Sequence, residues 1–128
     1  MKRVLAFALL ALTAVGCSDN EVKVGSRTTM EIDRVYDAGT VALGEVVHAS
    51  FKVKNTGDQP LVIGDVKVGC SCTLASKPEK PVNPGETAII EAKIDTQKIG
   101  QGKFNKGINV VANTNPSVTM IKIVGEVK

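Results

Sequence analysis

Residues 46–55 read VVHASFKVKN, and apolar side chains alternate with polar ones along this stretch. The apolar set is Val47, Ala49, Phe51 and Val53, and the polar set is His48, Ser50, Lys52 and Lys54. Successive side chains of a β-strand point to opposite faces of its sheet. The stretch therefore predicts a half-buried strand whose apolar face packs in the core.

The chain after Met30 repeats this pattern in short runs separated by turn signals. Strands are predicted at residues 60–63, 87–95, 106–113 and 118–127, with turns at 55–60, 83–86, 99–104 and 113–116. Pro84 and Gly85 suit the central positions of a type II turn. No window of useful length shows the helical period.

About seven short strands with regular turns predict an all-β fold. We expect an immunoglobulin-like antiparallel β-sandwich over residues 30–128, with a closed barrel as the alternative. The apolar positions change phase along the way, because Leu61 and Ile63 are odd-numbered whereas Val66 and Val68 are even-numbered. A bulge or bend near residues 64–65 would account for this change.

The first residues predict export from the cytoplasm. Lys2 and Arg3 precede an uncharged apolar run at residues 4–12, and small residues lead up to Cys17. This pattern is typical of a secretory signal peptide over residues 1–16, and the run is too short to span a membrane. The small residue before Cys17 makes the segment similar to a bacterial lipoprotein signal, in which the cysteine is lipidated and becomes the first mature residue.

Lipidation would make Cys17 the attachment point to a membrane, because two or three acyl chains hold a protein there. Ser18 would be the second residue of the mature chain, and a serine there resembles the signal that directs lipoproteins to the outer membrane. We therefore expect a bacterial cell-envelope lipoprotein on the periplasmic or the surface face, with residues 17–29 as lipidated N-terminus and tether. Ordinary secretion with Cys17 removed is the alternative.

Composition argues against several classes of function. Without Lys2 and Arg3 the chain has 14 basic and 13 acidic residues, and the basic residues are scattered, so nucleic-acid binding through phosphate contacts is not expected. The single histidine, His48, shares a polar strand face with lysines. The motifs of common hydrolases are missing. We expect no enzymatic activity, and no small-molecule substrate is evident.

Cys70 and Cys72 form the candidate chemical site, within the stretch KVGCSCTLAS at residues 67–76. If residues 66–74 form one extended strand, both cysteines face the same side as the preceding valines, as buried core residues usually would. A disulfide between them would need a turn. The Cα atoms of residues two apart in a strand are about 6.4–6.8 Å apart, and their Cβ vectors do not converge.

Two further interpretations of this pair stay open. An easily reduced disulfide would make Cys70 and Cys72 a labile redox pair in the oxidising envelope. Two thiolates are also suitable ligands for Cu(I), or for half of a zinc site, so copper or zinc is the only cofactor to consider. Zinc needs more ligands, and nothing in the sequence places His48, Met30 or Met120 nearby.

An ordered set of short motifs runs through residues 30–128. The motifs are Gly44-Glu45, Asn55-Thr56-Gly57, Pro60-Leu61 with Ile63, Cys70-Ser71-Cys72-Thr73, Pro81 to Glu86, Gly102 to Phe104, and Val111 to Asn113. Their order and spacing resemble the bacterial family known as domain of unknown function 1573, in which Gly usually stands where this chain has Ser71. The resemblance implies an immunoglobulin-like sandwich akin to Hydin-type and major-sperm-protein domains. Those relatives mostly bind other proteins, and the family brings no established activity.

These features together predict a non-enzymatic protein-binding or scaffolding module. Its partners would be the membrane, through the lipid anchor, and an unidentified envelope protein that docks on an exposed sheet edge. The alternative, from a different class, is a copper- or thiol-handling protein that uses Cys70 and Cys72.

Overall fold

Alternating side chains form the strands of this chain, and turn residues rich in Gly, Pro and Asn end them. The structure, a computed structural model, describes residues 26–128. Within these residues the elements are β1 (Met30–Ile32), β2 (Val35–Val41), β3 (Val46–Asn55), β4 (Ile63–Val68), β5 (Thr73–Ser76), β6 (Thr87–Asp95), α1 (Thr96–Ile99), β7 (Gly102–Ala112) and β8 (Val118–Val127).

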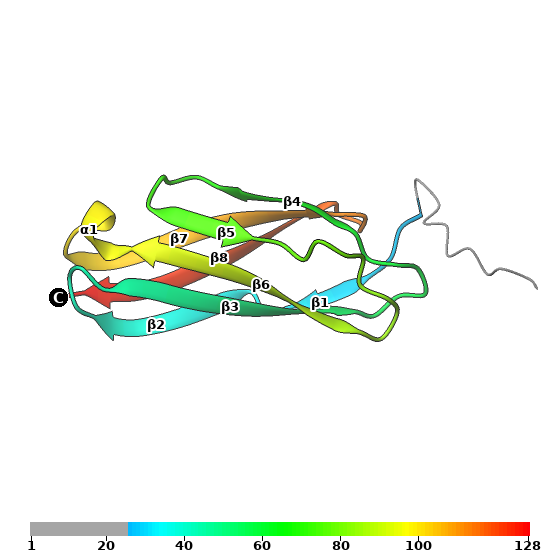
Figure 1. Cartoon of the computed structure of the whole chain (residues 1–128), viewed down its shortest axis with the longest axis horizontal. Helices are drawn as coiled ribbons and strands as arrows, with labels where there is room; N and C mark the ends of the chain where they lie inside the picture. Colours follow the sequence, from blue (N-terminus) through cyan, green and yellow to red (C-terminus); the bar gives the residue numbers. More distant parts are fainter. Residues whose placement is uncertain (1–25) are drawn as a thin grey trace, which may run out of the picture.

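The strands form two four-stranded sheets that pack against each other (Figure 1). The first sheet has the order β1-β3-β6-β5, and all its pairs are antiparallel. The second sheet has the order β2-β8-β7-β4, and β2 runs parallel to β8 while the other pairs are antiparallel. This arrangement is the predicted immunoglobulin-like sandwich. The described residues contain eight strands, whereas about seven were expected. Two of the eight, β1 and β5, are only three and four residues long, which is too short to give a clear alternation in the sequence.

The core lies between the two sheets and consists of alternate residues of the long strands. Along β3 the predicted alternation is confirmed, because Val47, Ala49, Phe51 and Val53 are at most 5% exposed while the side chains between them face solvent. The other long strands supply Ile90, Ala92, Ile94, Phe104, Ile108, Val110, Ala112, Ile121, Ile123 and Val127.

Two local features predicted from the sequence are also present. The register between β4 and β7 shifts between Ile63 and Asp65, which confirms the expected change of phase. The turn over residues 83–86 is of type II, because Gly85 at its third position has φ of 80°. The last N–H of that turn donates to its first carbonyl oxygen at 3.0 Å.

Residues 66–74 do not form one strand, so that expectation was wrong. β4 ends at Val68 in the second sheet, and β5 begins at Thr73 in the first sheet. The chain crosses between the sheets through the two cysteines. Side-chain parity could not reveal the crossing, because apolar residues keep even positions on both sides of the turn.

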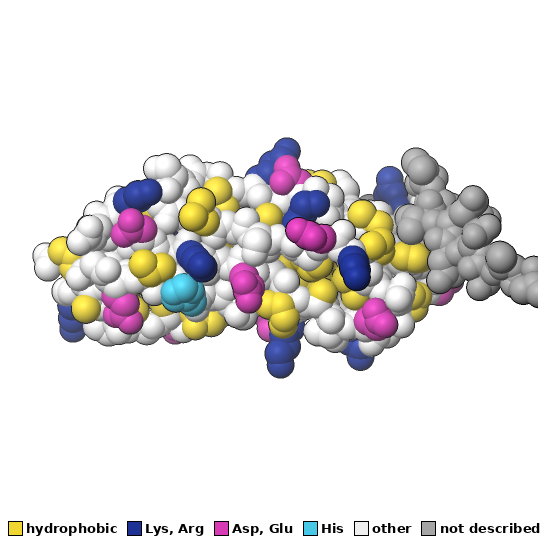
Figure 2. Space-filling view, viewed as in Figure 1, with side chains coloured by type: hydrophobic (Ala, Val, Ile, Leu, Met, Phe, Trp, Pro, Cys, Tyr) yellow, Lys and Arg dark blue, Asp and Glu magenta, His cyan; other side chains and the backbone are white. Residues whose placement is uncertain are grey.

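The outer face of the first sheet carries charges of both signs, and Val46, Leu74 and Ile89 are exposed among them. Figure 2 shows basic and acidic side chains mixed on this face, with the chain's one histidine among them. That residue, His48 of β3, is exposed, as the alternation predicted. Among residues 26–128 no helix is long and apolar enough to cross a bilayer.

Candidate functional site

A tight turn places the two cysteines between β4 and β5. The Thr73 N–H donates to the Cys70 carbonyl oxygen at 3.1 Å, which closes the turn, and the Asp95 N–H donates to the Cys72 carbonyl oxygen at 2.9 Å, which ties the turn to β6. The turn brings the Cα atoms of Cys70 and Cys72 to 5.2 Å, inside the range that a disulfide can bridge. The two cysteines are joined by a disulfide in this structure.

The two cysteines differ in their exposure to solvent. Cys72 is only 3% exposed, and its sulfur lies 3.5 Å from the Thr73 hydroxyl oxygen. Cys70 is half-buried and opens onto a hollow of about 230 Å³, whose lining includes Asn105 and Lys106 of β7. An attacking thiolate from outside would therefore reach the sulfur of Cys70 before that of Cys72.

Ser71 occupies the central position of the turn without backbone strain. Among residues 26–128 every residue with positive φ is a glycine, so Ser71 has an ordinary backbone conformation. The turn therefore does not require Gly at this position.

The other residues considered as metal ligands lie away from the cysteines. His48 is on the outer face of the first sheet, and Met30 and Met120 line a separate hollow between β1 and β8. Within the described part of the chain, no group of three or more His, Cys, Asp or Glu residues could hold a metal ion. The signal peptide and the predicted lipid attachment at Cys17 lie outside the described residues.

A buried asparagine, which the sequence reading treated only as a turn residue, fastens one end of the sandwich. Asn55 is fully buried, and its amide nitrogen donates to the carbonyl oxygens of Gln59 and Val82 at 2.7 and 2.9 Å. Its amide oxygen accepts from the Thr28 hydroxyl at 2.8 Å and from the Gly57 N–H at 3.0 Å. These contacts explain the Asn-Thr-Gly motif, because a Cβ at position 57 would collide with the Thr28 side chain.

A second asparagine performs the same task from the second sheet. The Asn113 amide oxygen accepts from the Val62 N–H at 2.7 Å, and its amide nitrogen donates to the carbonyl oxygens of Ser26 and Pro60, both at 2.9 Å. Thr28 is 5% exposed and its N–H donates to the Asn113 carbonyl oxygen. The last part of the predicted tether, residues 26–29, is therefore held against the sandwich.

The disulfide turn and the fastened N-terminal segment lie at opposite ends of the sandwich. In Figure 1 the connection between β4 and β5 lies at the end that carries α1 and the C-terminus, while the residues before β1 lie at the other end. A ten-residue strand such as β3 spans this length, roughly 33 Å.

The second sheet has two stretches of inner strand with a neighbour on one side only, among the residues that the structure describes. β4 pairs with β7 from Ile108 to Ala112, so residues 102–107 have β8 alone; we call these residues the β7 edge. β2 pairs with β8 from Lys122 onward, so residues 118–121 have β7 alone; we call these the β8 edge. Unpaired strand edges are sites at which another chain can add a strand.

The two edges differ in how well they are protected. Lys106 of the β7 edge stands at an inward-facing position between Phe104 and Ile108 and is half-buried. An inward-pointing charge is one of the devices that keep an edge from pairing with other chains. The β8 edge has no such charge, and its outward residues Val118 and Met120 are 49% and 60% exposed.

Solved structures of other proteins share this fold, among them the following three. They are a protein of unknown function from Porphyromonas gingivalis W83 (21% identity, TM-score 0.71), the Vibrio cholerae VesB protease (14%, 0.61), and the ASH / PapD-like domain 7 of human CEP192 (12%, 0.59). The alignments cover 85%, 77% and 97% of this chain. They cover 51%, 31% and 98% of the other chains, so this chain spans about half of the P. gingivalis protein and about a third of the protease. At these identities the likeness establishes the fold alone.

Sequence comparison supplies the family. A search of curated proteins found no match. The family profile described as "Protein of unknown function (DUF1573)" matches residues 28–127, which include every strand and both cysteines of the disulfide turn. The chain belongs to the DUF1573 family.

Proposed function

We propose that this chain is a non-enzymatic protein-binding module, held at the bacterial cell envelope by lipid on Cys17. The observation that carries the proposal is the pair of incompletely covered inner strands in the second sheet. Strands that lack a neighbour along these stretches offer main-chain hydrogen-bonding groups to an extended segment of another protein.

The attachment geometry limits how far the module extends from its membrane. Residues 26–29 are fastened to the sandwich by Asn55 and Asn113, and the eight residues between Cys17 and this segment would reach at most roughly 30 Å if fully extended. The domain would thus stay close to its membrane. Its disulfide turn, at the end opposite the fastened segment, would point away from the membrane.

The test is capture of a partner from intact cells. The full chain and a soluble Cys17→Ser variant are compared by crosslinking and affinity purification, and the fraction attached to membranes is measured for both. We expect the unaltered chain to be lipidated, to sediment with membranes and to enrich a defined envelope protein. An unaltered chain that is found free in the medium, or that enriches no protein above the level of the variant, would contradict the proposal.

A second candidate function is thiol–disulfide exchange at the Cys70–Cys72 turn. The unequal exposure of the two cysteines favours it. A thiolate of a partner would attack the Cys70 sulfur, form a mixed disulfide with it and release Cys72 as a thiolate. A second thiolate of the same partner would then displace Cys70, leaving a dithiol here and a disulfide in the partner. The disulfide leaves neither sulfur as a thiolate ligand, so the structure gives the copper alternative no support.

Two single variants separate exchange from a structural role. Cys72→Ser leaves the half-buried thiol of Cys70, which we expect to react with a disulfide reagent and to trap partner thiols. Cys70→Ser is the matched control, because its remaining thiol is 3% exposed and should react far more slowly. Equal reaction rates for the two variants would remove the structural basis of this candidate.

A further inference from the structure

We propose that the β8 edge (residues 118–121) is the docking site, and that its occupant is an extended segment of a partner protein carrying an apolar residue and a carboxylate. This inference rests on the proposed binding function and names the site and the chemistry of its partner. It depends on three features: the direction of the free backbone groups, the lining of the adjacent cavity, and the charge at one end.

The backbone of the β8 edge directs hydrogen-bonding groups toward the open side. The Lys122 N–H donates to the Arg34 carbonyl oxygen at 2.9 Å on the β2 side, and the Ser117 carbonyl oxygen accepts from Ala112 at the opposite, β7 side. Because these groups alternate along an antiparallel strand, Val118 and Met120 present their N–H and C=O groups to the β2 side. No strand within residues 26–128 pairs with them there.

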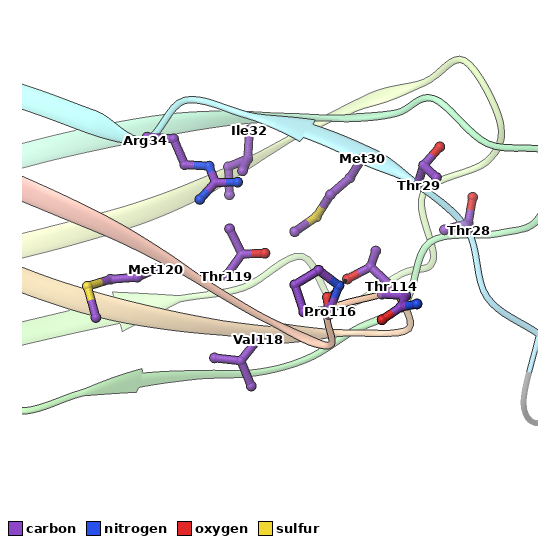
Figure 3. Close-up of a pocket in the computed structure, with 11 residues that line it drawn as sticks. Thr28, Thr29, Met30, Ile32, Arg34, Thr114, Pro116, Val118, Thr119 and Met120 are labelled. Carbon is purple, nitrogen blue, oxygen red and sulfur yellow. Dashed lines mark hydrogen bonds between the residues drawn. The ribbon is translucent and has the colours of Figure 1, made fainter.

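A cavity of about 270 Å³, lined by both apolar and polar side chains, lies beside these groups, between β1 and β8. Figure 3 shows Met30 and Ile32 pointing from β1 across the gap toward β8, and Thr119 pointing from β8 toward them. Both β1 side chains are only half-buried, because no strand covers them on this side. An added strand would complete the second sheet and bury them with an inward-facing apolar side chain.

Arg34 specifies the charge of the occupant. This exposed residue lines the same cavity, at the end where β2 begins, and Figure 3 shows its side chain turned into the gap beside Ile32. A carboxylate on the added segment would meet the guanidinium there. The open stretch is four residues long, about 13 Å, which limits the buried part of the segment to about four residues.

The β7 edge serves as an internal control for this proposal. It also lacks a neighbour, but its inward position is taken by Lys106, whose charge opposes burial of an added strand. If edge pairing alone decided binding, both edges would bind the same peptides. Our proposal requires that only the β8 edge does so.

The test uses capped hexapeptides as probes and the mature chain carrying Cys17→Ser. Ac-Thr-Val-Thr-Val-Thr-Glu-NH₂ and its counterpart with Lys in place of Glu are titrated while amide signals are followed by NMR. We expect the acidic peptide to bind more tightly, to shift the signals of Val118 and Met120, and to slow their hydrogen exchange. Arg34→Glu should reverse the preference in favour of the lysine peptide.

Two proline variants locate the contact. Met120→Pro removes an N–H that faces the open side and leaves the pairing with β7 intact, so folding should persist while peptide binding weakens about tenfold or more. Asn105→Pro is the matched control, because Asn105 is likewise exposed, faces outward and directs its N–H to the open side of the β7 edge. We expect Asn105→Pro to bind the peptide as the parent chain does.

Four results of the experiments on the purified chain would overturn the inference. They are absence of binding by either peptide, loss of binding in Asn105→Pro but not in Met120→Pro, binding that appears only after residues 17–25 are removed, and a dimer that the peptide dissociates. The third would assign the site to this chain's own N-terminal segment, and the fourth to a second copy. If Met120→Pro still captures the same envelope protein from cells, the docking site is wrong while the binding function stands.

Discussion

Replacement of Asn55 by Ala tests whether the buried asparagine holds the N-terminal end of the sandwich together. The side chain makes four hydrogen bonds of 2.7–3.0 Å, to Thr28, Gly57, Gln59 and Val82. The bonds to Thr28 and Val82 lie in fully buried surroundings. Alanine would leave the hydroxyl of Thr28 and the carbonyl oxygen of Val82 without these partners.

The expected loss follows from these four contacts. A net hydrogen bond contributes about 1 kcal/mol, and each buried group left unsatisfied costs about 1–3 kcal/mol. The groups of Gln59 and Gly57 lie nearer the surface and can turn to water, so the two buried partners dominate. We expect Asn55→Ala to lower the free energy of unfolding by about 3 kcal/mol. For a domain of this size the melting temperature would fall by roughly 12–24 °C.

Urea unfolding followed by circular dichroism measures this change, with Asn105→Ala as the control. Asn105 lies in an outward-facing, exposed position of β7, so its replacement should change the free energy of unfolding by no more than about 0.5 kcal/mol. The slope of the free energy against urea should stay the same in both variants. A loss below about 1 kcal/mol for Asn55→Ala, with an unchanged slope, would refute the assignment of Asn55 as a structural fastener.

Three further substitutions address the packing, the disulfide and the protected edge. Gly125→Ala should lower the free energy of unfolding in urea by about 1–3 kcal/mol, because a Cβ at position 125 would lie 2.6 Å from the buried ring of Phe104 in β7. Gly107→Ala is the control and should change this free energy little, because its Cβ would meet its nearest neighbour at 3.8 Å. Replacing Cys70 and Cys72 together by Ser should lower the free energy of unfolding by about 1.6 kcal/mol, the chain-entropy value for a three-residue loop. A decrease above about 4 kcal/mol would show that the turn depends on the disulfide. Lys106→Val should raise self-association in analytical ultracentrifugation, and a variant that stays monomeric would refute the protective role of the lysine.

The fold could be predicted from the sequence wherever local patterns determine it. The alternation along residues 46–55 predicts which side chains of β3 are buried, and the phase change near residue 64 marks the register shift opposite β7. Pro84-Gly85 specifies its turn through the positive φ that only Gly adopts easily. Each of these features depends on residues within about ten positions of one another.

Features that depend on distant contacts could not be predicted. Asn55 and Asn113 look like ordinary turn residues, and their partners lie up to 87 positions away in the sequence. In the sequence, apolar residues keep even positions through the cysteines as in a continuous strand, whereas in the structure β5 buries Thr73 and exposes Leu74. The β7 and β8 edges follow from strand order and register, which no local pattern contains.

The position of the two cysteines in the fold helps to separate the family motifs that serve folding from those that serve function. The Asn-Thr-Gly motif and Asn113 are explained by hydrogen bonds that the sandwich needs. The turn at Cys70–Cys72 is closed by the Thr73 N–H and anchored by the Asp95 N–H, two bonds to carbonyl oxygens, while the Cys72 N–H donates to the Cys70 sulfur at 3.1 Å. A turn with those two bonds does not need a covalent link across three residues, for which the expected stabilisation is small. The disulfide is therefore the motif that folding explains least, and it lies at the end of the sandwich opposite the tether and the β8 edge.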